Sequence, residues 1–128
     1  MKTALILRPD VVLRNATQHL FSKADIRSTM AEDCKHALHL LEKHPFTFVF
    51  MDYVQAEQNP FDLVRKMKNI QPNVLVLMAS VNLDPVLVSK AKEVGVDRVL
   101  PKKLDIEDVQ KSLIELEFFR ESPENLVG

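Results

Sequence analysis

The fold is decided by residues 46–52, which run Phe-Thr-Phe-Val-Phe-Met-Asp. Aromatic, β-branched and other apolar side chains fill the first six positions, and this composition favours a buried β-strand. The run ends in Asp52, so a carboxylate stands at the C-terminal end of the strand. In an open parallel α/β sheet these ends line the crevice where ligands bind. Asp52 is therefore the first candidate for a functional residue.

On either side of this strand, short apolar runs alternate with longer segments in which apolar residues recur every three or four positions. The pattern predicts strands at Thr3–Leu7, Asp25–Thr29, Thr47–Met51, Val74–Ala79 and Asp97–Leu100, and helices at Val12–Lys23, Ala31–His44, Pro60–Ile70, Pro85–Val94 and Ile106–Phe119. No hairpin signal separates consecutive strands, so the strands should be parallel and joined by right-handed crossovers. The predicted fold class is α/β, a three-layer α/β/α sandwich around a five-stranded parallel sheet.

The starts of the helices carry their own signals. Asn59-Pro60 and Asp84-Pro85 each place a capping side chain before a proline, a residue that suits the first position of a helix. Asp105 is expected to cap the last helix in a similar way. These signals predict where three of the helices begin.

Composition predicts one small domain without a strong charge bias. The chain has 128 residues, 46% hydrophobic and 27% charged, with 17 basic residues against 18 acidic ones. This balance indicates neither a nucleic-acid groove nor an anionic membrane surface as a partner. Cys34 has no partner for an internal disulfide, the N-terminus lacks a signal-peptide pattern, and no apolar run approaches the ~20 residues that span a bilayer. We therefore expect a cytoplasmic location.

Two further polar residues follow neighbouring predicted strands, Ser80 after the fourth and Lys102 after the fifth. Because the carboxyl ends of parallel strands meet at one edge of a sheet, both should face the same crevice as Asp52. This set, together with Gly95-Val96-Asp97 and Leu100-Pro101-Lys102, resembles the receiver domain of bacterial two-component response regulators over residues 2–118. The resemblance implies a flavodoxin-like receiver fold, with Asp52 as phosphoacceptor, Ser80 as a phosphate-binding hydroxyl and Lys102 as the cation paired with the phosphate.

The end of the first strand departs from the receiver pattern. Arg8 and Pro9 stand where the resemblance implies two adjacent acidic residues that hold Mg²⁺. Magnesium prefers hard oxygen ligands, which neither side chain offers, so we expect no cofactor and doubtful Mg²⁺ binding. Without the metal, phosphorylation should be slow or absent. The alternative is a working receiver that recruits Asp10 as a metal ligand and is phosphorylated on Asp52 by a histidine kinase.

Two other positions differ as well. Val99 stands where the resemblance implies an aromatic residue that rotates on activation, and Lys103 stands where it implies a proline. The first change removes the ring that couples pocket to surface, and the second removes a backbone constraint. In place of the metal, we expect the guanidinium of Arg8 to reach across the crevice and pair with Asp52. Such a pair would lock the domain in one state.

Other chemistries find less support in the sequence. Gly95 and Gly128 are the only glycines, too few for a phosphate cradle, and no Ser/His/Asp or Cys/His set stands at matching strand ends. His36 and His39 share a helix face but lack a third ligand for zinc. We therefore do not expect an enzyme. A structural salt bridge, kept by ancestry, is the alternative explanation for the charged residues of the crevice.

The function that fits these observations is a phosphorylation-independent pseudo-receiver that binds a protein partner or a second copy of itself. The resemblance implies two working surfaces, the edge between the first and fifth helices and the face of the fourth helix, fifth strand and fifth helix. The latter face carries charges of both signs, as a self-complementary dimer contact needs. These residues are Lys90, Glu93, Asp97, Arg98 and Lys111.

The last residues give a prediction about context. Residues 1–119 form the predicted domain, and residues 120–128, which turn polar and include Pro123, are expected to be a linker or the start of a following domain. Their end, Leu126-Val127-Gly128, is similar to the opening of the AAA+ ATPase module of bacterial enhancer-binding transcription activators. That similarity predicts the N-terminal regulatory domain of such an activator, which would reach DNA only through an attached domain.

Overall fold

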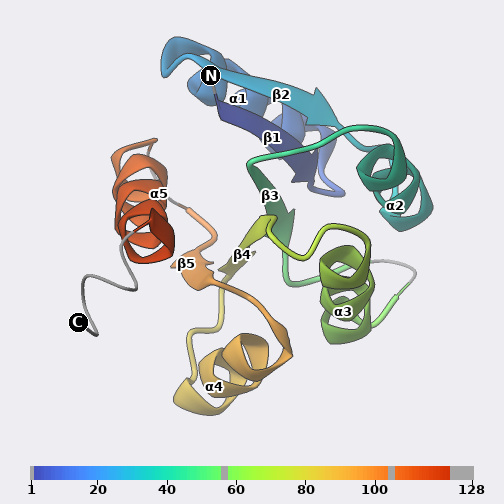
Figure 1. The fold of residues 1–128 in the computed structure, drawn as a ribbon, viewed down its shortest axis with the longest axis vertical. Helices are drawn as coiled ribbons and strands as arrows, with labels where there is room; N and C mark the ends of the chain where they lie inside the picture. Colours follow the sequence, from blue (N-terminus) through green and yellow to red (C-terminus); the bar gives the residue numbers. More distant parts are fainter. Residues whose placement is uncertain (1, 56–57, 104–105, 122–128) are drawn as a thin grey trace.

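Strands and helices alternate along the chain as predicted (Figure 1). The computed structural model describes residues 2–55, 58–103 and 106–121. Within them the strands are β1 (Lys2–Leu7), β2 (Ile26–Met30), β3 (Phe48–Asp52), β4 (Leu75–Ser80) and β5 (Arg98–Pro101). The helices are α1 (Val11–Lys23), α2 (Cys34–Lys43), α3 (Pro60–Ile70), α4 (Pro85–Val94) and α5 (Ile106–Glu121).

The strands form one parallel sheet in the order β2-β1-β3-β4-β5. β3 lies in the middle, and all of its residues are buried. Its Phe50 is in register with Ile6 of β1 on one side and Leu77 of β4 on the other. Because the strands are parallel, their carboxyl ends collect at one edge of the sheet, and Asp52 lies at that edge.

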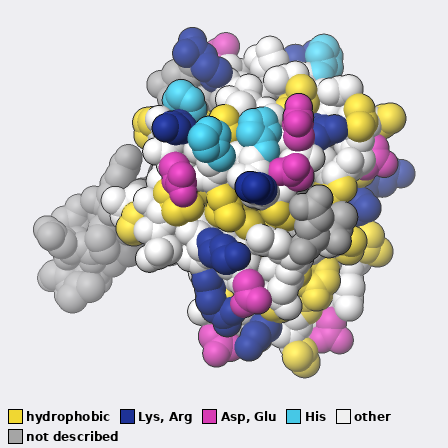
Figure 2. Space-filling view, turned by 90° about the vertical axis from the view of Figure 1, so that its right-hand side faces the viewer, with side chains coloured by type: hydrophobic (Ala, Val, Ile, Leu, Met, Phe, Trp, Pro, Cys, Tyr) yellow, Lys and Arg dark blue, Asp and Glu magenta, His cyan; other side chains and the backbone are white. Residues whose placement is uncertain are grey.

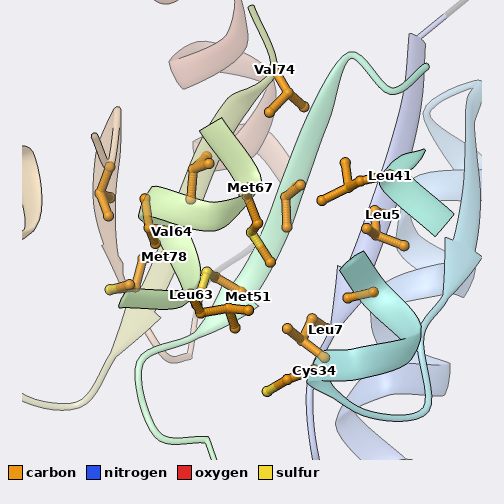
Figure 3. Close-up of a cluster of buried hydrophobic side chains, with 14 of the residues drawn as sticks. Leu5, Leu7, Cys34, Leu41, Met51, Leu63, Val64, Met67, Val74 and Met78 are labelled. Carbon is orange, nitrogen blue, oxygen red and sulfur yellow. The ribbon is translucent and has the colours of Figure 1, made fainter. Parts of the chain in front are cut away.

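Helices cover both faces of the sheet, with α2, α3 and α4 on one face and α1 and α5 on the other (Figure 1). On the first face Leu41 of α2, Leu63 and Met67 of α3 and Met51 of β3 belong to one buried cluster (Figure 3). The predicted three-layer sandwich is confirmed. None of the described helices combines the length and apolar character needed to cross a membrane.

The second face is built around aromatic rings. Phe21 of α1 meets Phe48 and Phe50 edge to face, with ring centroids 5.5 and 5.7 Å apart. Val109 and Leu113 of α5 complete this cluster. Alternate residues of β3 thus point to opposite faces, and the aromatic ones are directed to α1 and α5.

Several predicted boundaries differ from the observed ones by one to three residues, and two of these differences have local reasons. α2 begins at Cys34 rather than Ala31, because the side chain of Asp33 caps the helix and accepts from the backbone N–H of His36 at 2.7 Å. β2 begins after Asp25, whose φ of +59° is left-handed and does not continue a strand.

Two of the three predicted caps are confirmed. Asn59 accepts from the backbone N–H groups of Phe61 and Asp62 at 2.9 and 3.2 Å, and Asp84 accepts from that of Val86 at 2.7 Å. The predicted cap at Asp105 lies outside the described residues.

Gly95 ends α4 in a left-handed conformation with φ +118°. A Cβ at this position would lie 3.3 Å from Cγ of Lys68, so the glycine also leaves room for that side chain. Nζ of Lys68 then donates to the carbonyl oxygen of Val74 at 2.7 Å and to Asp97 at 2.8 Å. These bonds fasten α3 to the start of β4 and to the turn before β5.

Candidate functional site

The carboxyl ends of β3, β4 and β5 and the loop after β1 surround a cavity of about 290 Å³. Asp52, Ser80 and Lys102 all line it, so the structure brings together the three residues that the sequence placed in one crevice. The other lining residues are Pro9, Asp10, Tyr53, Val54, Ala79, Val81 and Asn82.

The charge of Asp52 is met by Arg8, as expected from the sequence. Nε of Arg8 donates to Oδ1 of Asp52 at 3.1 Å, and Nη2 lies 3.0 Å from the same oxygen. Both side chains are buried, with 5% and 6% of their surface exposed. Because both nitrogens approach a single oxygen, the pair lacks the two-oxygen fork of an ideal guanidinium–carboxylate contact.

The rest of the Arg8 guanidinium is engaged as well. Nη1 donates to Oγ1 of Thr17 on α1 at 3.0 Å, and Nη2 donates to the carbonyl oxygen of Lys102 at 3.4 Å. The guanidinium carbon lies 5.2 Å from the centre of the Phe50 ring, which is a cation–π distance. Arg8 therefore ties the end of β1 to α1, to β3 and to the segment after β5.

Thr17 is a site residue that sequence reasoning missed. Its hydroxyl donates to the carbonyl oxygen of Leu13 at 2.6 Å, which leaves its lone pairs to accept from Arg8. The residue is buried. It lies midway between Leu13 and Phe21 at four-residue spacing, so a hydroxyl interrupting an otherwise apolar helix face was the available signal.

Gln55 is a second residue that the sequence did not single out. Its Nε2 donates to the backbone carbonyl oxygen of Asp52 at 2.7 Å and to that of Leu7 at 3.5 Å. The side chain therefore holds the ends of β3 and β1 together. Backbone acceptors leave no pattern in the sequence, and nothing there pointed to this glutamine.

Asp10, the candidate metal ligand, caps α1. Its Oδ1 accepts from the backbone N–H groups of Val12 and Leu13 at 2.8 and 3.1 Å. Mg²⁺ needs several oxygen ligands in octahedral geometry. Here Arg8 already bonds to Oδ1 of Asp52, and the side chain of Pro9 has no oxygen to offer the metal. Across residues 2–55, 58–103 and 106–121, no group of three His, Cys, Asp or Glu side chains is placed to hold a metal ion. The pocket does not fit the Mg²⁺ that the resemblance implies.

The hydroxyl of Ser80 is turned toward its own loop. It donates to the carbonyl oxygen of Asn82 at 2.8 Å and accepts from the N–H of Asn82 at 3.2 Å. Since Ser80 is also buried, its hydroxyl is used within the turn after β4. Binding of a phosphate by this hydroxyl would require that turn to open.

Lys102 contributes its backbone and its side chain to different parts of the site. Its N–H donates to the carbonyl oxygen of Ser80 at 3.1 Å, and its own carbonyl accepts from Arg8. The side chain is exposed and lines the cavity. Within the part of the chain that the structure describes, Asp52 forms its ion pair with Arg8 and not with Lys102.

The charged residues predicted for the face of α4, β5 and α5 are not equally available. Lys90, Glu93 and Lys111 are exposed. Asp97 is instead half-buried, and its carboxylate bonds to Lys68 as described above. Its charge is therefore already compensated within the fold.

Arg98 and Val99 lie on β5, and Lys103 follows it. Arg98 pairs with Glu115 of α5, with Nη2 and Oε2 3.1 Å apart. Val99, where the resemblance implies a ring, is half-buried against the cluster on the α2, α3 and α4 side. Lys103 is exposed.

The histidines lie away from the cavity. Nδ1 of His36 accepts from the backbone N–H of Glu32 at 3.0 Å, and His39 is exposed. Figure 2 shows histidine side chains gathered on the face that α2 and α3 cover, among basic and acidic side chains. Charges of both signs are mixed on this face, in keeping with the near-zero net charge.

Comparisons with known proteins agree with this fold. The family model of the response regulator receiver domain matches residues 5–114. A CheY-like receiver domain protein from Methanospirillum hungatei JF-1 is similar in structure, with a TM-score of 0.82, 17% identity, and coverage of 91% of this chain and 97% of that one. Chemotaxis protein CheY4 of Vibrio cholerae gives a TM-score of 0.83 at 21% identity, over 90% of this chain and 98% of that one.

A third similar structure is a response regulator protein from Burkholderia pseudomallei with a phosphorylated aspartic acid and a calcium ion. Its TM-score is 0.82 at 19% identity, over 98% of this chain and 75% of that one. No curated protein matches this chain. At these identities the solved structures establish the fold, whereas the family model matches most of the sequence. The chain therefore belongs to the family of response regulator receiver domains, which are modules of signal transduction.

Proposed function

We propose that this receiver domain signals without phosphorylation, as a protein-interaction module whose pocket is held in one state by the pair of Arg8 and Asp52. The observation that carries the proposal is the buried guanidinium bonded to the carboxylate that a phosphoryl group would have to reach. A guanidinium keeps its proton at any pH at which proteins remain folded.

The electrostatics of the pocket support this proposal. Phosphoryl transfer depends on metal cations that neutralise charge on the phosphoryl oxygens. Arg8 carries a positive charge, but its nitrogens are committed to Asp52, Thr17 and a backbone carbonyl. A divalent cation brought to Asp52 would lie close to this buried guanidinium and be repelled by it. Phosphorylation of Asp52 should accordingly be slow or absent.

The output in this proposal is a contact with a protein partner or a second copy of the chain, which regulates a transcription factor attached to the domain or separate from it. The similarity of residues 126–128 to an activator module supports an attached output.

A competing function is that of a phosphoacceptor receiver served by a histidine kinase. It is favoured by one observation, that Asp52 lines the cavity together with Ser80 and Lys102. For this function Arg8 would have to leave Asp52, and the turn that holds the Ser80 hydroxyl would have to open. The two functions therefore differ in how the pocket responds to Mg²⁺ and to a phosphoryl mimic.

The test is a ¹⁵N–¹H NMR titration of the chain with Mg²⁺, followed by beryllofluoride, which stands in for a phosphoryl group on Asp52. We expect the amide signals of Asp52, Ser80 and Lys102 to stay in place at millimolar Mg²⁺ and beryllofluoride. Localised shifts at these residues that spread to β5 would overturn the proposal in favour of the phosphoacceptor.

A matched variant makes an unchanged spectrum informative. The double substitution Arg8→Asp, Pro9→Asp restores two adjacent acidic residues at the end of β1 and removes the guanidinium. We expect this variant to show Mg²⁺-dependent shifts around Asp52 that the original chain lacks. If neither chain responds although both spectra are well dispersed, Arg8 is not what excludes the metal, and the locking role assigned to it is wrong.

A further inference from the structure

Exposed hydrophobic side chains are concentrated at the edge of the sheet that holds the pocket. Among the described residues, eight large hydrophobic side chains are exposed, and six of them follow β1, β3 or β4. These six are Val11, Val12, Val54, Val81, Leu83 and Val86. Single exposed hydrophobics are ordinary, but a gathering of them at one place marks an interaction site.

Three loops bring apolar side chains to the mouth of the cavity. Pro9 after β1, Val54 after β3 and Val81 after β4 all line it. Val54 is 72% exposed and Val81 is 82% exposed, so neither serves the core. We call these three residues the apolar collar. The cavity inside it measures about 290 Å³, and a cavity of about 150 Å³ is already enough for a benzene ring. The volume is therefore sufficient for one leucine or phenylalanine side chain.

Among the described residues that line the cavity, Asp52, Asp10 and Lys102 carry charges, and they differ in how these charges are compensated. Asp52 is neutralised by Arg8, and Asp10 lies against the positive end of α1 as its cap. Lys102, by contrast, lines the cavity with an exposed side chain that has no acidic partner among the described residues. Lys103 next to it is exposed as well. A carboxylate on an incoming ligand would find its counterpart in Lys102.

We propose that the apolar collar binds a peptide segment of a partner protein, with an apolar side chain in the cavity and a neighbouring carboxylate against Lys102. This inference rests on the proposed function and deepens it, because it names the surface and the chemistry of the partner. The buried ion pair of Arg8 and Asp52 holds the base of the cavity in place. The site is therefore formed before binding and needs no phosphoryl group. A pre-formed site lowers the entropic cost of ordering on binding.

A membrane surface fits these features less well than a peptide does. Binding to anionic lipid relies on several basic residues and on apolar side chains that reach outward into the bilayer. The apolar collar instead surrounds a cavity, and Lys102 is the single lysine among the described residues that line this cavity. A concave apolar site with one cation suits an apolar side chain flanked by an acidic one.

The test begins with a displayed library of short random peptides selected on the immobilised chain. We expect the enriched peptides to share an apolar residue next to Asp or Glu. A synthetic peptide of that sequence should shift the amide signals of Val54, Val81 and Lys102. Val81→Asp and Lys102→Glu should each weaken its binding by about tenfold or more, measured by NMR titration.

Two control variants repeat the same chemical changes elsewhere. Ile114→Asp alters an exposed apolar side chain on α5, and Lys66→Glu alters an exposed lysine on α3. Both should bind the peptide as the original chain does. Because all four positions are exposed, the variants should fold, which their NMR spectra will show.

Several outcomes would overturn the inference. The first is that the selection enriches no peptide. The second is that the enriched peptide binds the Val81→Asp variant as strongly as it binds the original chain. The third is that the original chain binds phosphatidylglycerol vesicles and that Val81→Asp abolishes this binding. If the original chain self-associates and Val81→Asp abolishes that self-association, the apolar collar binds a second copy of the chain instead of a partner protein. None of these depends on the Mg²⁺ and beryllofluoride titration, so failure of the docking site and failure of the phosphorylation-independent function are told apart.

Discussion

Asp52 and Asp97 are two carboxylates beside strands of the same sheet, and each meets a cation from another element. The pair of Arg8 and Asp52 is buried, with 5% and 6% of the side-chain surfaces exposed, whereas the pair of Lys68 and Asp97 has 23% and 25% exposed. Asp97 also accepts from the backbone N–H of Val76 at 2.8 Å. The first pair lies at the pocket, and the second fastens α3 to the strands next to it.

The difference shows that surroundings decide what an ion pair does. A buried charge that loses its partner has no water to replace it, so breaking such a pair is costly. A partly exposed charge regains water, and its pair stabilises the fold less. Substitutions that break the ion pairs of this domain should therefore rank by burial, beginning with the pair at the pocket.

The largest effect is expected for Arg8→Ala. This substitution leaves Asp52 buried without its partner and removes the bonds to Thr17 and the Lys102 carbonyl, so the free energy of unfolding should fall by about 3–5 kcal/mol. Urea denaturation followed by circular dichroism measures the loss.

The control for Arg8→Ala replaces both charges with apolar side chains of similar size. The double variant Arg8→Met, Asp52→Leu leaves no unpaired charge and should recover most of the lost stability. A loss below about 1 kcal/mol for Arg8→Ala alone, the range of exposed pairs, would contradict the view that this pair locks the pocket.

The sequence predicted this pair but only part of its surroundings. β3 was predicted because its apolar run is long and aromatic, and Arg8 was notable because it stands where the resemblance implies an acid. Arg8 also donates to the backbone carbonyl of Lys102. Every residue has such a carbonyl, so the sequence could not predict this contact. The turn that holds the Ser80 hydroxyl depends on local geometry after β4, and so does the left-handed Asp25 before β2.

An intermediate effect is expected for Asp97→Ala. The change removes the ion pair with Lys68 and leaves the N–H of Val76 without its acceptor, which should cost about 1–3 kcal/mol in the same urea experiment. Asp97→Asn is the matched control, because an amide oxygen still accepts from Val76 while the charge is gone. If both variants lose the same stability, the ion pair rather than the backbone bond carries the contribution of Asp97.

The smallest effect is expected for Arg98→Ala. Arg98 and Glu115 have 31% and 44% of their side-chain surfaces exposed, so their pair should contribute about 0.2–1 kcal/mol. Salt screens exposed charges, so the difference in free energy of unfolding between the original chain and Arg98→Ala should shrink further in high salt. Arg65→Ala is the control, since Arg65 and Asp62 are 2.8 Å apart but more than half exposed, and its effect should be no larger. A loss for Arg98→Ala as large as that for Arg8→Ala would mean that burial does not set the ranking, and that the charge on β5 holds α5 in place.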